Sequence, residues 1–292
     1  MKLKDPYGRP VSNLRISLTP VCNLSCIYCH REGEKNPDQS MEADEIAGIL
    51  HVAEKFDITS VKFTGGEPLL REDIVDIIRS VPDSMESSIT TNGTLLSRYA
   101  ADLKEVGLSR VNVSIDSLNP VTYKAITGSD QLSVVLDGID SALMAGLTPV
   151  KLNMVLLAGI NDHELEDFFA YIRNNRNLIL QFIELMDTGA CTSHKDLTIL
   201  ESDLENRSRV IMTRRMHHRK KYCLDGAEVE VVRPLHNTEF CRYCNRLRVT
   251  SDGKLKPCLL RTDNHIDIRG KKGEDLEAAF REAVRRREPF YR

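Results

Sequence analysis

Residues 14–29 read LRISLTPVCNLSCIYC, a short apolar run that leads directly into three closely spaced cysteines. The run at 14–18 has the length and the branched apolar side chains that are typical of a buried strand. Cys22, Cys26 and Cys29 follow it with C-x3-C-x2-C spacing. Tightly grouped thiols indicate metal binding rather than disulfides, so this stretch predicts a strand followed by a metal-binding loop.

Outward from this stretch, the chain alternates short apolar runs with helix-length segments as far as about residue 186. The apolar runs are rich in Val and Ile, as is typical of parallel strands that are buried on both faces. Further strands are expected at 61–64, 88–91, 111–115, 150–157 and 178–185. Apolar residues at helical spacing predict helices at 42–55, 72–80, 96–106, 133–145 and 163–174.

Six strand–helix units in series predict an α/β fold with a parallel sheet. Six units are too few for a closed eight-fold barrel. The pattern therefore leaves two alternatives, a partial barrel and an open doubly wound sheet.

The pattern changes after about residue 187, where we place a soft boundary between domains 1–187 and 188–292. Residues 188–206 have the composition of a loop-rich connector, and residues 207–221 carry seven Arg or Lys. The later elements expected are hairpins with strands at 222–224 and 229–232 and at 246–250 and 254–257, and an amphipathic helix at 274–287.

The composition of the 292 residues excludes some classes of function. A net charge of −3 argues against a general binder of nucleic acid or of membrane surfaces, which is normally strongly basic. No stretch approaches the roughly 18 apolar residues of a membrane span, and residues 1–10 lack the apolar core of a signal peptide. We expect a cytoplasmic protein, with no nucleic-acid or membrane partner, whose eight cysteines are mostly reduced thiols.

The first cysteine group can hold three irons of a [4Fe–4S] cube and leaves the fourth iron without a protein ligand. Structural and electron-carrying clusters usually have four Cys. The open iron therefore predicts a catalytic cluster at which a cofactor binds. The alternatives are incidental thiols and a zinc site, for which His30 is badly placed because it is adjacent to Cys29.

Polar motifs follow three of the predicted strands. Gly65 and Gly66, in KFTGGEP at 62–68, let the backbone approach a ligand closely. TTNG at 90–93 and SIDS at 114–117 end the next two strands. Ligand sites of parallel α/β folds lie at the carboxyl ends of the strands, so these motifs predict one converging site. Ordinary turns and helix N-caps are the alternative.

A second cysteine group, Cys241, Cys244 and Cys258, has C-x2-C-x13-C spacing. The Asp252-Gly253 turn would bring Cys258 back beside the other two. The group predicts either a second cluster with an open iron or a zinc site. The fourth ligand of a zinc site would come from His236, His265 or Cys223.

Arg246 and Arg248 lie between these ligands and would share one face of a strand. Two guanidinium groups at that place predict a polyanionic substrate that bears phosphate. The alternative is a pair of surface arginines on a small hairpin. On either interpretation the two side chains lie beside the second cysteine group.

The C-x3-C-x2-C loop and TGGEP resemble the radical SAM superfamily, in which S-adenosylmethionine (SAM) binds the open iron through its methionyl amine and carboxylate. One electron from the cluster then cleaves SAM to methionine and a 5′-deoxyadenosyl radical. With TTNG, SIDSL, FIELM and C-x2-C-N-R-L-R-x-T-x-D-G-x-L-x-x-C-L, these motifs resemble the GTP 3′,8-cyclase family of molybdenum cofactor biosynthesis, in the expected order from about residue 10 to 270.

The resemblance implies a partial (β/α)6 TIM-type barrel with a C-terminal extension that carries a second [4Fe–4S] cluster. It implies that the radical abstracts hydrogen from C3′ of GTP and that the C3′ radical attacks C8 of guanine. Reduction then gives (8S)-3′,8-cyclo-7,8-dihydroguanosine 5′-triphosphate. The reduction requires an electron donor such as ferredoxin or flavodoxin. A separate synthase converts this product to cyclic pyranopterin monophosphate. The resemblance leaves the oligomeric state open, with a homodimer as one candidate.

The resemblance also implies roles for particular residues. The ligands of the two clusters are Cys22, Cys26, Cys29, Cys241, Cys244 and Cys258. The SAM contacts are Tyr28, Gly66, Ser114 and Met186, although core packing is the alternative for the methionine. The substrate contacts are Arg15, Lys62, Thr90, Lys151, Arg246, Leu247 and Arg248.

Two rival functions stand beside this interpretation. Another two-cluster radical SAM enzyme, such as one that modifies a peptide, would share the first cysteine loop but would need no triphosphate site. A zinc-binding module without enzyme activity would hold one zinc for each cysteine trio. In addition, the family commonly ends in a Gly-Gly tail that reaches the active site, whereas residues 289–292 read PFYR.

Overall fold

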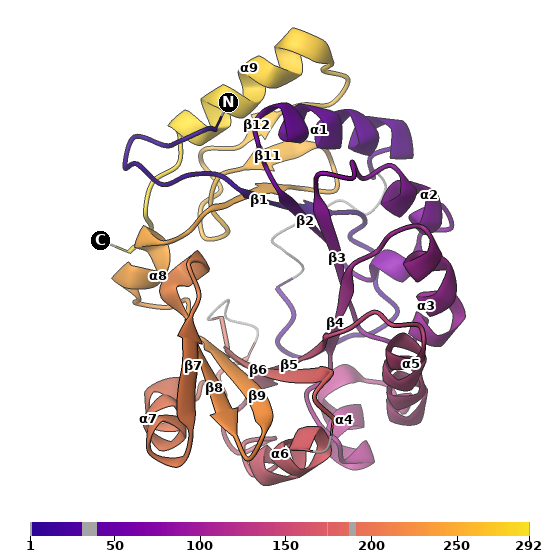
Figure 1. Ribbon diagram of the computed structural model, residues 1–292, viewed down its shortest axis with the longest axis vertical. Helices are drawn as coiled ribbons and strands as arrows, with labels where there is room; N and C mark the ends of the chain where they lie inside the picture. The colour runs from indigo at the N-terminus through magenta and orange to yellow at the C-terminus, as the bar shows by residue number, and fades with distance from the viewer. Residues whose placement is uncertain (1, 31–39, 174, 187–190, 292) are drawn as a thin grey trace.

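The fold is built on six parallel strands that follow one another around a curved sheet (Figure 1). The computed structural model describes residues 2–30, 40–173, 175–186 and 191–291. Each strand pairs in parallel with the next one in the sequence. This sequential order confirms the six predicted strands and is that of a partial barrel, not of a doubly wound sheet. The strands are β1 (Asn13–Ser17), β2 (Ser60–Thr64), β3 (Glu86–Thr91), β4 (Arg110–Ser114), β5 (Val150–Leu156) and β6 (Leu178–Glu184).

Helices connect consecutive strands and cover the outer face of the sheet (Figure 1). They are α1 (Ala43–Lys55), α2 (Ile74–Arg79), α3 (Leu96–Glu105), α4 (Pro120–Thr127), α5 (Leu132–Met144) and α6 (Leu165–Arg173), with a short 3-10 turn η2 (Pro68–Leu70). Helix α4 was not predicted from the sequence pattern, because it is only 8 residues long. Local signals fix α4 instead, since the Asn119 side chain caps its first turn and Gly128 ends it with a φ of 75°.

The two faces of the strands differ in chemistry, because alternate side chains point to opposite faces. The outward face is apolar and lies in the core under the helices, with Leu14, Ile16, Val61, Phe63, Val111 and Val113 fully buried. The inward face is polar and lines a cavity, with Asn13, Arg15, Ser60, Lys62, Ser88, Thr90, Asn112, Lys151, Asn153 and Gln181. The strands are thus largely buried on both faces, as predicted, but the buried inward face is polar because the barrel encloses a cavity in place of a packed apolar centre.

The C-terminal part of the chain adds strands to both edges of the six-stranded sheet. At one edge, β9 (Ala227–Val232) pairs in parallel with β6 and is followed outward by β8 (Lys220–Leu224) and β7 (Arg209–Thr213). At the other edge, β10 (Arg246–Val249) pairs in parallel with β1, and β11 (Lys254–Lys256) and β12 (Ile266–Asp267) follow. Both predicted hairpins are present, and the described residues form one 12-stranded sheet.

Two short elements join the C-terminal strands across the open side of the barrel. The 3-10 turn η3 (Met216–His218) lies between β7 and β8, and α8 (Thr238–Arg242) precedes β10. The backbone N–H of His217 donates to the carbonyl oxygen of Tyr243 at 3.0 Å, and its ring stacks on Phe240 with 3.6 Å between the centroids. Segments attached to opposite edges of the sheet thus contact each other.

Two predictions for the C-terminal part have different outcomes. The helix expected at 274–287 is α9 (Gly273–Arg285), which packs near α1 through stacked rings of Phe56 and Phe280. The connector at 188–206 is not loop-rich throughout, because α7 (Leu197–Arg207) occupies its second half. That helix buries Leu197, Leu200 and Leu204, which recur at helical spacing. None of the described helices is long and apolar enough to cross a membrane.

Candidate active site

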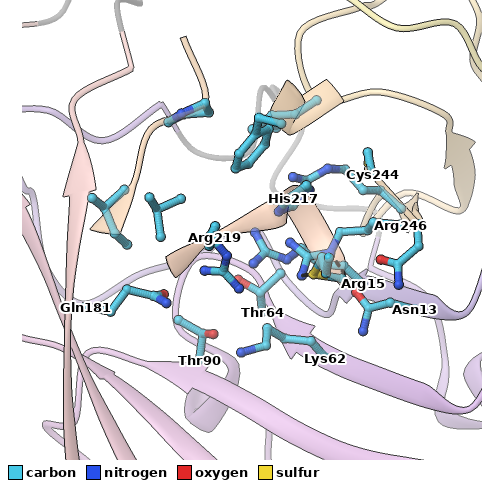
Figure 2. Close-up of a pocket in the computed structure, with 18 of the residues that line it drawn as sticks. Asn13, Arg15, Lys62, Thr64, Thr90, Gln181, His217, Arg219, Cys244 and Arg246 are labelled. Atoms are coloured by element: carbon cyan, nitrogen blue, oxygen red, sulfur yellow. Dashed lines mark hydrogen bonds between the residues drawn. The ribbon is translucent and has the colours of Figure 1, made fainter. Parts of the chain in front are cut away.

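A cavity of about 860 Å³ occupies the centre of the barrel, between the inward face of the sheet and the C-terminal elements (Figure 2). Its walls come from β1 to β6, from the segment around η3, and from the loops that bear the second cysteine group. Among the described lining residues, eleven are Lys or Arg and two are Glu. This surplus of positive charge suits a polyanionic ligand.

The first cysteine group lies on the loop between β1 and α1, and the strand-end motifs hold this loop in place. Asn92 donates through Nδ2 to the sulfur of Cys22 at 3.8 Å and to the side-chain oxygen of Asn23 at 2.8 Å. The hydroxyl of Tyr28 donates to Asp116 at 2.6 Å. TTNG and SIDS therefore contact the cysteine loop directly, and Tyr28 lines the cavity beside it.

TGGEP also contacts the cysteine loop through its backbone. The N–H of Gly66 donates to the carbonyl oxygen of Thr19 at 2.6 Å, and the N–H of Glu67 donates to that of Val21 at 2.8 Å. A Cβ atom at Gly66 would lie 2.1 Å from the Val21 oxygen. Glycine is therefore needed at this position so that two backbone segments can approach closely. The segment that approaches Gly66 is the backbone at Val21, whereas a ligand was expected there from the sequence.

Glu67 joins the ends of β2 and β3. Its carboxylate accepts hydrogen bonds from the hydroxyl of Thr91 at 2.7 Å and from the backbone N–H groups of Asn92 and Leu69 at 2.6 and 3.0 Å. Burial raises its pKa to about 7, although these hydrogen bonds act to lower it. The group is fully buried, so its role is to fix the strand ends that carry the cysteine loop.

The thiols of the first group interact electrostatically with one another. Burial raises the pKa of Cys22, and burial together with the charge of Asp116 raises that of Cys26; the neighbouring thiols of the trio add to both shifts. Bare thiolates are thus unfavourable here, and iron bound to the three sulfurs would supply the compensating positive charge. The donor set of three thiols on one loop fits a [4Fe–4S] cube with one open iron.

The second cysteine group lies on the wall of the cavity, since Cys241, Cys244 and Cys258 all line it. Burial acts to raise the pKa of Cys244, but the charge of Arg287 and the backbone N–H and charge of Arg246 outweigh it and lower the pKa. A lowered pKa favours the thiolate, which is the form that binds iron. This trio fits a second cluster placed among cations.

An ion network connects both ends of the described chain to this second group. Asp5 pairs with Arg9 at 2.7 Å and with Arg287 at 3.2 Å. Arg9 donates to the carbonyl oxygen of Cys241 at 2.8 Å, and Arg287 donates to that of Cys244 at 2.7 Å. The sequence did not reveal these three residues, because the contacts of Arg9 with Cys241 and of Arg287 with Asp5 join distant positions and leave no local pattern.

The structure places most of the residues implied by the resemblance on this cavity. Tyr28, Ser114 and Met186 line it, as do Arg15, Lys62, Thr90, Lys151, Arg246 and Arg248. Among the described lining residues, Cys241, Cys244 and Cys258 are present, whereas Gly66, Leu247 and the first trio, Cys22, Cys26 and Cys29, are not. The Leu247 side chain points away into the hydrophobic core, so only its backbone is available to a ligand.

Within the described residues, no three His, Cys, Asp or Glu side chains converge on one point as the ligands of a single metal ion do. A [4Fe–4S] cube does not need that convergence, since each thiolate binds a different iron. Cys191 and Cys223 lie outside both trios, and Cys191 packs against a small apolar cluster that contains Leu157 and Leu185.

A partial barrel whose first strand leads into a C-x3-C-x2-C loop beside a cationic cavity defines a radical SAM enzyme, a class that uses SAM and a [4Fe–4S] cluster. Residues 16–172 match the model of the Radical SAM superfamily. The structure of Streptococcus suis SuiB bound to S-adenosylmethionine is similar, with a TM-score of 0.67 and 18% identity over 94% of this chain and 69% of that chain. At that identity the likeness shows the fold alone.

The C-terminal part and two relatives identify the particular family. Residues 178–292 match the model of Molybdenum Cofactor Synthesis C. The chain is 50% identical over 292 residues to the "Probable GTP 3′,8-cyclase" of Methanocella arvoryzae, covering 99% of this chain and 95% of the relative. It is 51% identical over 300 residues to the protein of that name from Methanosarcina acetivorans, covering 99% and 90%. The chain belongs to the GTP 3′,8-cyclase family.

Proposed function

We propose that this chain converts GTP to (8S)-3′,8-cyclo-7,8-dihydroguanosine 5′-triphosphate, the first step of molybdenum cofactor biosynthesis. The membership of its family supports this activity. The structural observation that carries it is a cationic cavity that is lined by the second cysteine trio and by Tyr28 and His30, which flank Cys29 of the first trio. A radical source and a phosphate-bearing substrate would meet there without crossing solvent.

The roles of the cavity residues follow from their places. We propose that Cys22, Cys26 and Cys29 hold the first cluster and that Cys241, Cys244 and Cys258 hold the second. The first cluster with bound SAM supplies the radical that starts the reaction. SAM would lie against Tyr28, Gly66, Ser114 and Met186, which come from the cysteine loop and from the ends of β2, β4 and β6.

The substrate residues would neutralise and orient the triphosphate. Lys62 is held among Arg15, Arg246 and Lys151, and its pKa is lowered well below the usual value by burial and by those neighbouring cations. A triphosphate bound there would offset this repulsion and favour the protonated lysine. Thr90, Arg248 and the backbone of Leu247 complete the proposed contacts. A peptide substrate has no such charge, so the cavity favours GTP over the peptide-modifying rival.

The direct test is anaerobic product analysis with both clusters assembled. With GTP, SAM and a chemical reductant, we expect one cyclised triphosphate for each 5′-deoxyadenosine, resolved by liquid chromatography and mass spectrometry. Cytidine triphosphate has the same charge and no purine C8, and serves as the control substrate. SAM cleavage that leaves GTP unchanged in every condition would contradict the proposed function.

Arg248→Ala is expected to weaken GTP binding about tenfold to a hundredfold, because a hydrogen bond to a charged partner contributes about 1.5–3 kcal/mol. Arg248 of β10 lines the cavity, and its register partner on the neighbouring parallel strand β1 is Arg15. The loss should be larger for GTP than for guanosine, and iron content should not change. Equilibrium binding and iron analysis on one anaerobic sample check both points. Arg285→Ala, on the exposed side of α9, is the matched control.

A loss of iron from Arg248→Ala, with guanosine and GTP affected alike, would show instead that the arginine braces the hairpin. Full iron with unchanged GTP affinity would remove Arg248 from the substrate site.

The remaining partners follow from the same family. We propose that the enzyme takes electrons from a donor such as ferredoxin or flavodoxin and passes its product to cyclic pyranopterin monophosphate synthase. We also propose a cytoplasmic location, where exposed clusters stay reduced, and a homodimer as the assembly. Residues 1–187 would form the radical SAM domain and residues 188–292 the substrate-binding domain.

A further inference from the structure

Residues 214–219, called the basic loop below, link β7 to β8 and carry three of the seven Lys and Arg residues at 207–221. The backbone N–H of Arg214 donates to the carbonyl oxygen of Arg219 at 2.8 Å, which closes the loop on itself. Arg214, Arg215 and Arg219 all line the cavity. Neither the resemblance nor the proposed function gives this loop a role.

Contacts with the second cysteine region fix the position of the basic loop. The stacking of His217 on Phe240 and its backbone hydrogen bond to Tyr243 hold one side. Arg246 donates to the sulfur of Met216 at 3.4 Å on the same side. The basic loop therefore stands at a fixed distance from the second cluster site and from a proposed substrate arginine.

Glu230 of β9 holds the cations of the basic loop together with Lys151. Its Oε1 lies 2.9 Å from Nζ of Lys151 and 2.6 Å from Nη2 of Arg214, and its Oε2 lies 3.7 Å from Nη1 of Arg219. Gln181 donates to Oε2 at 2.9 Å. Burial acts to raise the pKa of Glu230, but the three cations lower it to about 2, so the carboxylate stays charged.

This cluster has more donors and more positive charge than its one carboxylate can satisfy. Glu230 is 0% exposed and lies behind Lys151, Gln181, Arg214 and Arg219, which face the cavity. In the part of the chain that the structure describes, Nε of Arg219 is buried without a hydrogen-bond partner. A buried donor left without an acceptor costs about 1–3 kcal/mol, so an acceptor supplied by a ligand is expected.

Arg219 is aimed at the proposed substrate residues. Figure 2 shows its side chain pointing into the pocket, on the side where Gln181, Thr90 and Lys62 lie. A ligand that contacts Lys62 and Lys151 would therefore meet the guanidinium group of Arg219. Guanidinium groups match the non-bridging oxygens of phosphate in geometry and in charge.

We propose that Arg219 and Arg214 are further substrate-binding residues that contact the phosphate groups of the nucleotide, and that Glu230 is a positioning residue that sets both arginines and Lys151. This inference rests on the proposed function for the identity of the nucleotide. It adds phosphate contacts from the C-terminal part of the chain to those proposed for Lys62 and Thr90 of the barrel.

Arg219→Gln tests the inference in the protein with both clusters assembled. We expect GTP affinity to fall about tenfold to a hundredfold, by the value of a charge-assisted hydrogen bond, and guanosine affinity to stay unchanged. Anaerobic equilibrium binding of GTP, GDP, GMP and guanosine gives this series, and Arg219→Lys should recover part of the loss. Arg207→Gln is the matched control, because Arg207 lies on α7 and pairs with Glu166 on the surface. Arg214→Gln is the second variant if Arg219→Gln does not fold.

Glu230→Gln tests positioning through a pH profile. The charged groups that face Lys151 are Glu230, Arg214, Arg219 and, from β2, Lys62. Burial lowers the pKa of Lys151 to about 8, and Glu230 opposes that shift. The lysine is charged below its pKa, so GTP affinity should fall as pH rises through about 8. Without Glu230 that fall should begin at a lower pH, which a merely structural role would not produce.

The outcomes separate this inference from the proposed function. Equal losses for GTP and guanosine, loss of iron, or an unchanged binding series in Arg219→Gln would each overturn the inference. Inorganic tripolyphosphate serves as a second probe. If the unmodified protein binds tripolyphosphate but not GTP, the proposed function fails, while weaker tripolyphosphate binding in Arg219→Gln would still support the inference.

Discussion

Cys26→Ala is expected to abolish SAM cleavage, with 5′-deoxyadenosine at the level of a sample without protein. Two thiolates remain on the loop, and they cannot hold a cube that leaves only one iron open. Burial and the charge of Asp116, the partner of Tyr28, raise the pKa of the Cys26 thiol, so this side chain interacts with a support of the loop. Iron content should fall by about four atoms per chain, the content of one cluster.

Cys191→Ala is the matched control for this experiment, because Cys191 belongs to neither trio and packs against Leu157 and Leu185. It should keep its iron and its SAM cleavage. Anaerobic iron analysis and chromatography of the reaction mixture measure both. A normal yield of 5′-deoxyadenosine from Cys26→Ala would contradict the role of this loop.

Cys244→Ala is expected to block formation of the cyclised triphosphate, to less than about one hundredth of normal, by loss of the contact that holds the substrate. SAM cleavage should continue, because the first trio lies on a separate loop of the barrel. The side chain lines the cavity, and neighbouring arginines lower the pKa of its thiol. The expected result is therefore 5′-deoxyadenosine without cyclised product, measured in one anaerobic assay.

Cys223→Ala, on β8 and outside both trios, is the control for the second experiment. Its product yield should match that of the unmodified enzyme. Cyclised GTP at an undiminished rate from Cys244→Ala would show that the second cluster does not hold the substrate.

The sequence predicted those parts of the fold that depend on local patterns. The runs at 61–64 and 111–115 are strands because branched apolar residues favour a buried sheet, and their order follows from the strand–helix alternation. Gly107 and Gly146 have positive φ just after the ends of α3 and α5, where glycine is favoured. The cysteine trios were visible because ligand spacing is itself a local pattern.

Features that depend on distant contacts were not predictable in this way. A polar residue such as Asn112 or Gln181 within a strand does not show whether it faces solvent or an enclosed cavity. The carboxylate of Glu230 has partners from β5 and from the basic loop, and Arg287 has a partner 282 positions away along the chain, Asp5. These pairings exist only after the sheet has curved, so no periodicity in the sequence records them.

The pairing of β1 with β10 has a consequence for folding of the protein during its synthesis on the ribosome. Arg246 donates to Asn13 across 233 positions of sequence, so β1 emerges from the ribosome long before its outer edge receives a partner. An unpaired strand edge is a template for pairing with other chains, and contacts of such sequence separation form slowly. The nascent barrel therefore passes through a stage in which aggregation competes with completion. The second cysteine group depends on a later segment in the same way, because the carbonyl oxygen of Cys244 accepts from Arg287, which is translated after all three cysteines of that group.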